Sequence, residues 1–485
     1  MRIQTRFSPL LTQLPVGLLL LVLLGATALF VIDGLQVIPF RYPMDYGEGP
    51  LLAQTLKLGR LEGIYRADLT VPPYTVSNYP PLYPLLLSPA ARLWGPAFWY
   101  GRTLSWLSIA VAAALLGLIV EALTRDRLAA TVAALLLLAF PPAAYWASLY
   151  RVDALALALS LAGLCVCARR PRAASTVPLA LVLLTAAVFT RQSYGLAAPL
   201  AACSWLLHAA GWRRAMTLAA SFIGLAGGLF LGLDRATGGG FAYNTIAANI
   251  NDFVPSSLLG YFSDVWMLMP LTLVAAGLFA ISAGWVAVPS WYLVAPYLVG
   301  ALLSGLTIGK VGSNVNYLLE LGAAVSLSIG ALLAWQRPRR LVQGTLALLL
   351  ALDVALMVLA APYRTVAHAR LAQAEAAERL FAIVDGANGL VLADEEMGLL
   401  PLASRPIHLQ PFEMTQLARA GRWDQGPLLR EIESQAFAVI LVFRLPDVPL
   451  HRTRWTDEML EAIGRRYVLE ERVGQTDVYR PRPAR

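Results

Sequence analysis

The chain alternates long apolar runs with short polar connections as far as about residue 361, where the pattern changes. An apolar helix needs about 20 residues to cross roughly 30 Å of hydrocarbon. By this criterion we expect about eleven crossings, some of them short. They lie at 16–38, 97–122, 128–147, 152–168, 177–190, 194–210, 215–233, 265–284, 288–308, 317–335 and 341–361. The pattern predicts a transmembrane core at 1–361 and a soluble part at 362–485.

Arginine clusters predict the orientation of this core, because cytoplasmic loops of membrane proteins are enriched in Lys and Arg. The clusters occur at alternate connections: Arg2 and Arg6, then 124–127, 169–172, 212–214 and 337–340. We expect them inside, so that the long first loop 39–96 and everything after 361 are extracytoplasmic. The first apolar run is expected to stay as an anchor, since it is long and no A-x-A-like cleavage site follows it.

The composition agrees with a membrane protein, because 58% of residues are hydrophobic and 14% are charged. The net charge of +8 could suggest nucleic acid, but the inner arginine clusters account for much of it. Only Lys57 and Lys310 are lysines, and both fall in outward segments. The three cysteines lie in apolar runs, so we expect packing residues and predict neither a disulfide framework nor a C-x-x-C metal site.

The first outer loop, 39–96, is much longer than a hairpin needs and contains two helix-like stretches, "EGPLLAQTLKLG" and "PPLYPLLLSPAARLWG". They are too short or too rich in Pro to span, so we expect them to lie along the interface. The aromatic residues between Tyr74 and Tyr100 have two interpretations. They anchor the loop at the headgroups, or Tyr79 and Tyr83 belong to a sugar or lipid cleft.

The part after 361 is predicted to be a small α/β domain. "AHARLAQAEAAERLFAIV" has the period of an amphipathic helix, "GLVLAD" and "AFAVILVF" are typical of short buried strands, and "YVLEERVGQTDVYRP" is typical of a hairpin. Its acids and histidines show no H-E-x-x-H or G-x-S-x-G spacing and no Gly-rich phosphate loop. The sequence therefore assigns no chemistry to this domain.

Charged residues collect at the predicted outer border of the core. A charge at a helix centre costs roughly 2.5 to 3.5 kcal/mol on insertion scales, so these residues need partners or a function. Acids and bases at one membrane surface suit a negatively charged headgroup and a reaction beside it. Alternatively, each caps a helix or lies in the interface. The set is Asp45, Glu48, Arg151, Asp153, Arg191, Lys310 and Glu320.

The order of motifs resembles the GT-C superfamily of membrane glycosyltransferases, in the branch of protein O-mannosyltransferases and aminoarabinose transferases. The motifs are "MDYGEG", "YPPLYPLLLSP", "GPAFWYGRTLSWLS", "YRVDALALALSLAGL", "TRQSYG" and "KVGSNVNYLLE". Each motif is weak alone, but their order is specific, and the resemblance covers most of 16–335. It implies a polytopic α-helical membrane protein with about eleven GT-C-like crossings and a small C-terminal soluble α/β domain.

The resemblance implies an enzyme that moves a sugar from a polyprenyl-phosphate carrier to a lipid, glycan or protein acceptor on the outer face, with inversion. Asp45 falls at the position of the family's catalytic acid. Many relatives have adjacent "DE", whereas the second acid here is Glu48, three positions on, so its role stays open between catalysis and orientation. The substrate-binding candidates are Tyr79, Tyr83, Arg151, Asp153, Arg191, Lys310, Asn316 and Tyr317.

The chemistry needs a carboxylate base for the acceptor hydroxyl, which Asp45 offers, and a cation for the phosphate, which Arg191 or Lys310 offers. No general acid is obligatory, because a phosphate is already an acceptable leaving group. A divalent ion joining Asp45 or Asp153 to the phosphate stays open. We expect the protein in the plasma membrane of a bacterium, with its active site and C-terminal domain outside.

Other classes of protein share parts of this pattern. A lipid or sugar transporter or flippase is also polytopic, but such proteins tend to hold ionisable groups near the membrane midplane. A non-catalytic scaffold would use the C-terminal domain to bind partners. A ligase that transfers a whole oligosaccharide is the nearest alternative among enzymes. The sequence names neither the sugar nor the acceptor.

Overall fold

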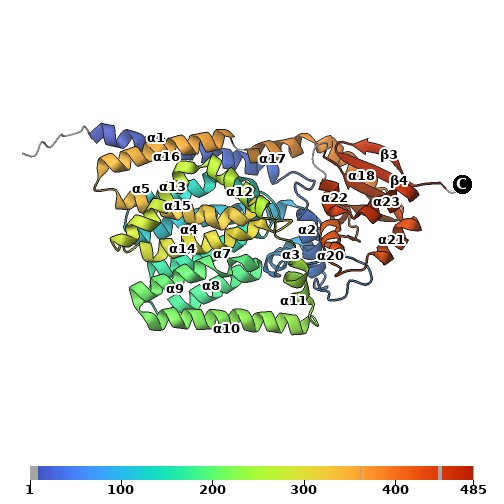
Figure 1. Ribbon diagram of the computed structural model, residues 1–485, viewed down its shortest axis with the longest axis horizontal. Coiled ribbons are helices and arrows are strands. Elements are labelled where there is room, and N and C mark those ends of the chain that lie inside the picture. Colours follow the sequence, from blue (N-terminus) through green and yellow to red (C-terminus); the bar gives the residue numbers. More distant parts are fainter. Residues whose placement is uncertain (1–8, 361, 446–449, 484–485) are drawn as a thin grey trace, which may run out of the picture.

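The computed structural model describes residues 9–360, 362–445 and 450–483. The arginines at positions 2 and 6 and the boundary residue at 361 lie outside these ranges. A long helical bundle occupies one end of the molecule and a small sheet with its helices occupies the other (Figure 1). The bundle consists of α1 (Pro9–Val37), α4 (Trp99–Thr124), α5 (Arg127–Ala139), α6 (Pro141–Ala147), α7 (Asp153–Arg169), α8 (Thr176–Thr190), α9 (Ala197–Ala210), α10 (Trp212–Ala236), α12 (Pro255–Leu268), α13 (Pro270–Trp285), α14 (Trp291–Gly305), α15 (Leu319–Trp335) and α16 (Arg340–Ala360).

These apolar helices make the chain a multi-pass membrane protein. Among the described residues, six helices are long and apolar enough to cross a membrane, or eight if each of two bent pairs forms one span. Every predicted crossing contains a helix, but the number of eleven is not confirmed. The difference arises at α7, α8 and α9, which have 17, 15 and 14 residues and are therefore shorter than the about 20 that a full span needs.

The bundle has a buried centre and a lipid-facing periphery. In the span that contains α15, 89% of the apolar window is buried inside the protein, whereas only 6% is buried in α10. Small residues allow the close approach at α15: a Cβ on Gly330 would lie 2.8 Å from the Cβ of Ala133, and one on Gly322 would lie 2.3 Å from the ring of Phe140. The helix α15 is therefore closely packed at the centre of the bundle.

The first loop carries α2 (Glu48–Gly59) and α3 (Leu82–Trp94), which confirms its two predicted helices. A buried ion pair attaches the start of α2 to α4. Arg102 donates from Nη2 to Oε2 of Glu48 over 2.6 Å, and both side chains are fully buried. The guanidinium also donates to the carbonyls of Val37 and Tyr42. Glu48 and Arg102 therefore hold the end of α1, the "MDYGEG" turn and α4 together.

The C-terminal part begins with α17 (Pro362–Ala372) and α18 (Ala374–Asp385), so the single predicted amphipathic helix is divided at Gln373. A four-stranded sheet in the order β1-β2-β4-β3 follows. The β1/β2 pair is parallel and the other two pairs are antiparallel, with β3 and β4 as a hairpin. The predicted strands and hairpin are confirmed. The elements are β1 (Leu390–Ala393), α19 (Leu399–Leu402), α20 (Pro411–Arg419), α21 (Gly426–Glu433), β2 (Phe437–Phe443), α22 (Leu450–Arg454), α23 (Asp457–Arg466), β3 (Tyr467–Val473) and β4 (Thr476–Pro481).

The sheet-containing part packs directly against the first loop, 39–96. The backbone N–H of Tyr74 donates to the carbonyl of His408, and the N–H of Gln410 donates to the carbonyl of Tyr74. Trp423 donates from Nε1 to the carbonyl of Leu69 over 2.8 Å. Apolar side chains from both segments form one buried cluster. A site between the helical bundle and the sheet therefore has walls from both the first loop and the C-terminal part.

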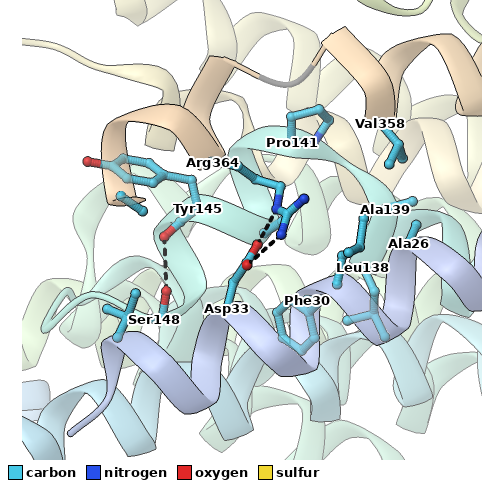
Figure 2. A pocket seen from close by; sticks show the side chains of 14 residues that line it. Ala26, Phe30, Asp33, Leu138, Ala139, Pro141, Tyr145, Ser148, Val358 and Arg364 are labelled. Carbon is cyan, nitrogen blue, oxygen red and sulfur yellow. Dashed lines mark hydrogen bonds and ion pairs between the residues drawn. The ribbon is translucent and has the colours of Figure 1, made fainter. Parts of the chain in front are cut away.

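An ion pair joins α17 to α1. Figure 2 shows Asp33 of α1 and Arg364 of α17 pointing toward one another across a small, mostly apolar pocket. The guanidinium of Arg364 forms two hydrogen bonds to the carboxylate, over 2.7 and 2.9 Å. Bidentate pairs of this kind fix orientation as well as distance. They hold the connection between the bundle and the sheet in place.

Candidate active site

A cavity of about 430 Å³ lies between one end of the helical bundle, the first loop and the C-terminal part. Two carboxylates and three cations line it: Asp45, Glu413, Arg151, Lys310 and Arg454. The cavity thus brings together ionic side chains from four distant parts of the sequence. Six of the predicted site residues line it, namely Asp45, Tyr79, Arg151, Lys310, Asn316 and Tyr317.

Asp45 lies in the turn just before α2, partly exposed to the cavity. Its Oδ2 accepts hydrogen bonds from the N–H of Gly47 over 2.9 Å and from Nη1 of Arg151 over 3.1 Å. In the described part of the chain, no hydrogen bond reaches Oδ1, which leaves that oxygen for a substrate. Burial raises the pKa of Asp45, and the Arg151 guanidinium opposes this shift. A carboxylate with a raised pKa is a stronger base than an ordinary Asp once it is ionised.

Glu48, the second acid of the motif, faces away from the cavity. Besides the Arg102 pair, its carboxylate accepts hydrogen bonds from the backbone N–H of Met44 over 2.7 Å and of Tyr150 over 2.8 Å. A fully buried charge with this many donors is well compensated. Through these bonds Glu48 determines the shape of the turn that presents Asp45.

Asp153 lies at the first turn of α7, behind the cavity wall, and joins three other segments. It accepts hydrogen bonds from Nε1 of Trp146 and from Nδ2 of Asn316, each over 2.9 Å. It also forms an ion pair with Arg191, whose guanidinium lies 4.4 Å from the ring centroid of Tyr317. Asp153 and Arg191 are both almost completely buried. They therefore orient Trp146, Asn316 and Tyr317, which line the cavity.

Lys310 lies in the connection between α14 and α15, in an extended segment. A backbone bridge pairs this residue with Phe253, and the N–H of Val311 donates to the carbonyl of Asp252. The Lys310 ammonium donates to the carbonyl oxygen and to Oδ1 of Asn249, over 3.0 and 3.1 Å. These partners are neutral, so the positive charge of Lys310 is available to an anion in the cavity.

The two predicted tyrosines occupy different layers. Tyr79 lines the cavity, where its hydroxyl accepts a hydrogen bond from Nη2 of Arg151 over 3.4 Å. Tyr83 of α3 is fully buried, donates to the carbonyl of Gly101 and packs edge to face on Tyr150. Tyr79 can therefore contact a ligand, whereas Tyr83 supports the wall.

Residues from the C-terminal part complete the cavity, and sequence analysis missed them. Tyr46 donates from its hydroxyl to Oε2 of Glu413 over 2.8 Å, and Nδ2 of Asn78 donates to Oε1 of the same carboxylate. The guanidinium of Arg454 lies 4.7 Å from the ring centroid of Tyr46 and is ion-paired with Glu395. Burial raises the pKa of Glu413 despite these hydrogen bonds. No motif singles out Glu413, because its partners Tyr46 and Asn78 lie 367 and 335 residues away along the chain.

The sequence left open a divalent ion that joins Asp45 or Asp153 to the phosphate. Among the described residues, no group of three or more His, Cys, Asp or Glu side chains is placed to hold an ion. The cations near Asp45 and Asp153 are the side chains of Arg151 and Arg191. Arg151, Lys310 and Arg454 bring positive charge to the lining of this cavity.

Comparison of the sequence with protein-family models gave no match, and neither did a search of curated proteins. Solved structures do match. ArnT from Cupriavidus metallidurans bound to undecaprenyl phosphate is 13% identical with a TM-score of 0.56, and the match covers 94% of this chain and 97% of that one. The apo state of the same protein is 12% identical, with the same TM-score and coverage. AglB from Archaeoglobus fulgidus, in complex with an inhibitory peptide and a dolichol-phosphate, is 12% identical with a TM-score of 0.49, covering 94% and 74%.

At these identities the likeness concerns the fold. The chain has, over nearly its whole length, the fold of ArnT, an aminoarabinose transferase of the GT-C class. This confirms the fold that the order of sequence motifs implied.

Proposed function

We propose that the protein is a glycosyltransferase that moves a sugar from a polyprenyl-phosphate donor to an acceptor hydroxyl at the extracytoplasmic surface of the membrane. The observation that carries this proposal is the position of Asp45. Its partly buried carboxylate lines a large cavity together with Arg151 and Lys310, in a chain with the fold of ArnT. A base beside cations is the arrangement that sugar transfer from a phosphate requires.

Asp45 acts as the general base. Arg151 and the N–H of Gly47 hold Oδ2, so Oδ1 is directed to the acceptor hydroxyl. The acceptor oxygen attacks the anomeric carbon while its proton passes to Asp45. The bond from that carbon to the phosphate oxygen breaks, and the carrier phosphate leaves with the electron pair. Because this is a single displacement, the anomeric configuration is inverted.

The cations stabilise the phosphate as charge develops on it. Lys310 supplies a point charge whose partners in the structure are neutral oxygens. Arg191, the other sequence candidate, does not line the cavity; it is a positioning residue for Tyr317, which does. Arg454 adds a third cation: its Nη1 is buried and has no hydrogen-bond partner among the described residues. That donor is available to a bound anion.

The donor is a lipid-linked sugar, and its class follows from two observations. The structural neighbour ArnT was solved with undecaprenyl phosphate bound. In this chain the cavity lies at one end of a bundle of apolar helices, where a polyprenyl tail can remain among lipids while its phosphate reaches Lys310.

Glu48 is a positioning residue in this mechanism, because it shapes the turn through Arg102 and does not line the cavity.

Incubation of the purified protein with radiolabelled polyprenyl-phosphate sugars and a membrane lipid extract, followed by mass analysis, tests the proposal. A new product carrying the labelled sugar, with release of polyprenyl phosphate, is expected. A transporter or flippase would move the intact donor across a vesicle membrane and leave the sugar on its carrier. Intact donor after incubation with the sugars tried, together with translocation in vesicles, would replace the transferase with that alternative.

A further inference from the structure

A second cavity, of about 320 Å³, adjoins the first along α2. Its walls come from α2, from the segment after it and from the C-terminal part near Ile407. Four residues line both cavities and form a partition between them: Pro50, Gln54, Val76 and Gln410. The two cavities therefore adjoin at these residues, and Asp45 lines the first of them.

The charged residues that line this second cavity are all cationic: Lys57, Arg60 and Arg405. Arg60 pairs with Glu62 at the exposed rim, and Arg405 donates to the carbonyls of Gly389 and Asp385. Lys57 is partly buried, and no hydrogen bond or ion pair to its ammonium occurs in the described ranges. Burial lowers its pKa. An ammonium in this state gains most from an anionic ligand, because three donors are unused.

The partition contains a second unused polar group. Gln54 is only 8% exposed, and its Oε1 is buried without a hydrogen-bond partner among the described residues. A buried acceptor left unpaired costs about 1–3 kcal/mol, so it is expected to meet a donor when the site is filled. A hydroxyl is such a donor. Gln54 thus offers a hydrogen-bond acceptor to a ligand, whereas Lys57 offers only donors. Gln54 lies at the boundary between the two cavities.

We propose that the second cavity binds the sugar acceptor, with an anionic group such as a phosphate against Lys57 and a hydroxyl-bearing portion passing Gln54 toward Asp45. This proposal rests on the transferase function above. The length of α2 indicates the distance between the two ends of the acceptor. The helix begins at Glu48, directly after the turn that carries Asp45, and Lys57 is nine residues further on, which corresponds to about 13 Å along the helix axis. The acceptor therefore carries its anionic group at roughly that distance from the hydroxyl that receives the sugar.

The two lysines of the chain allow a direct test, because Lys310 lies in the first cavity and Lys57 in the second. The full chain in phosphatidylcholine nanodiscs is saturated with undecaprenyl phosphate, treated with pyridoxal 5'-phosphate and borohydride, and digested for mass analysis of each lysine. We expect labelling of Lys57 to persist with the carrier bound. It should fall when glycerol 3-phosphate is added or when phosphatidic acid replaces part of the lipid.

Protection by glycerol 3-phosphate indicates a water-soluble acceptor, and protection by phosphatidic acid alone indicates a lipid; both support the anion site. Loss of Lys57 labelling on addition of undecaprenyl phosphate alone would assign the cavity to the donor and overturn the proposal. Labelling of Lys57 that is unchanged by glycerol 3-phosphate and by phosphatidic acid would also overturn it. In a binding assay with radiolabelled glycerol 3-phosphate or phosphatidic acid, whichever protects, Lys57→Gln should bind about tenfold more weakly. Lys57→Arg should bind as the wild type does.

A transfer assay on the same preparation separates the two proposals. Protection of Lys57 without any sugar transfer would leave the anion site standing and remove the transferase function. Transfer without protection would leave the function standing and remove this cavity as the acceptor site.

Discussion

Nη1 of Arg151 lies 3.1 Å from Oδ2 of Asp45, at a place that only a glycine two residues after the acid leaves open. A Cβ on Gly47 would lie 1.4 Å from that nitrogen. The ion pair therefore depends on the glycine of "MDYGEG" as well as on the two charges. This gives the motif a structural explanation that its acids alone do not provide.

Gly47→Ala should displace the Arg151 guanidinium from Asp45 while the fold persists. Misplacement of a reacting group by about 1 Å can cost roughly 10²-fold in rate, so we expect a loss of that order in single-turnover transfer. Gly63→Ala is the matched control, because a Cβ there meets no atom within 4 Å. Wild-type rates for both variants would show that the pair does not depend on residue 47.

Arg102→Met should destabilise the protein strongly, because it leaves Glu48 buried without its partner. Breaking a buried pair in this way typically costs about 3–5 kcal/mol. Thermal unfolding in detergent, followed by tryptophan fluorescence, measures the effect. Glu121→Gln on the same helix removes an ion pair with Arg127 that is 40% and 91% exposed, so it should change the melting temperature little. Similar melting temperatures for the two variants would contradict the role given to the buried pair.

The pH profile should report the state of Asp45. The base acts only when ionised, and burial raises its pKa, so transfer should decline with falling pH above the usual range of an aspartate. Arg151 opposes the shift, and Arg151→Gln should therefore move this acid limb to higher pH. Single-turnover rates across pH for both proteins measure it. An acid limb that stays in place in Arg151→Gln would mean that another group controls it.

The orientation of the chain rests so far on arginine clusters. We expect Glu461→Cys, in the C-terminal part, to react with an impermeant maleimide on intact cells, and Arg127→Cys to react only after lysis. Both positions are well exposed, with side chains 70% and 91% accessible. The wild type is the control, because its cysteines lie in apolar helices. Labelling of position 461 only after lysis would mean that the predicted number of crossings is wrong.

Much of this architecture could be predicted from the sequence because its signals are local. Apolar period and length located the bundle helices, and the same pattern located β2 and the β3–β4 hairpin. The association of Asp45 with Arg151 followed only from the shared outer border of the membrane. The partners in the C-terminal part were not predicted, since Tyr46 and Glu413 are 367 residues apart and neither stands in a motif with the other.

The opposite orientations of the two acids in "MDYGEG" could not be predicted either. Asp45 and Glu48 are three positions apart, and the sequence left the role of Glu48 open between catalysis and orientation. The structure separates them, because Arg102 of α4 lies on the side that Glu48 faces. That arginine is the only charged residue of the "GPAFWYGRTLSWLS" segment, which is rich in aromatic residues. Only the packing of α4 on the first loop makes its partner evident.

The identity of Asp45 as the base is tested most directly by single-turnover sugar transfer in Asp45→Asn, with Glu413→Gln, the other carboxylate of the same cavity, as the matched control. The amide keeps the size of the side chain and can still accept hydrogen bonds from Gly47 and Arg151, so donor binding should persist. Removal of a general base commonly costs about 10²- to 10⁴-fold, and we expect a loss in this range for Asp45→Asn. Glu413→Gln should retain most of the rate. Transfer by Asp45→Asn at the wild-type rate would contradict the proposed mechanism.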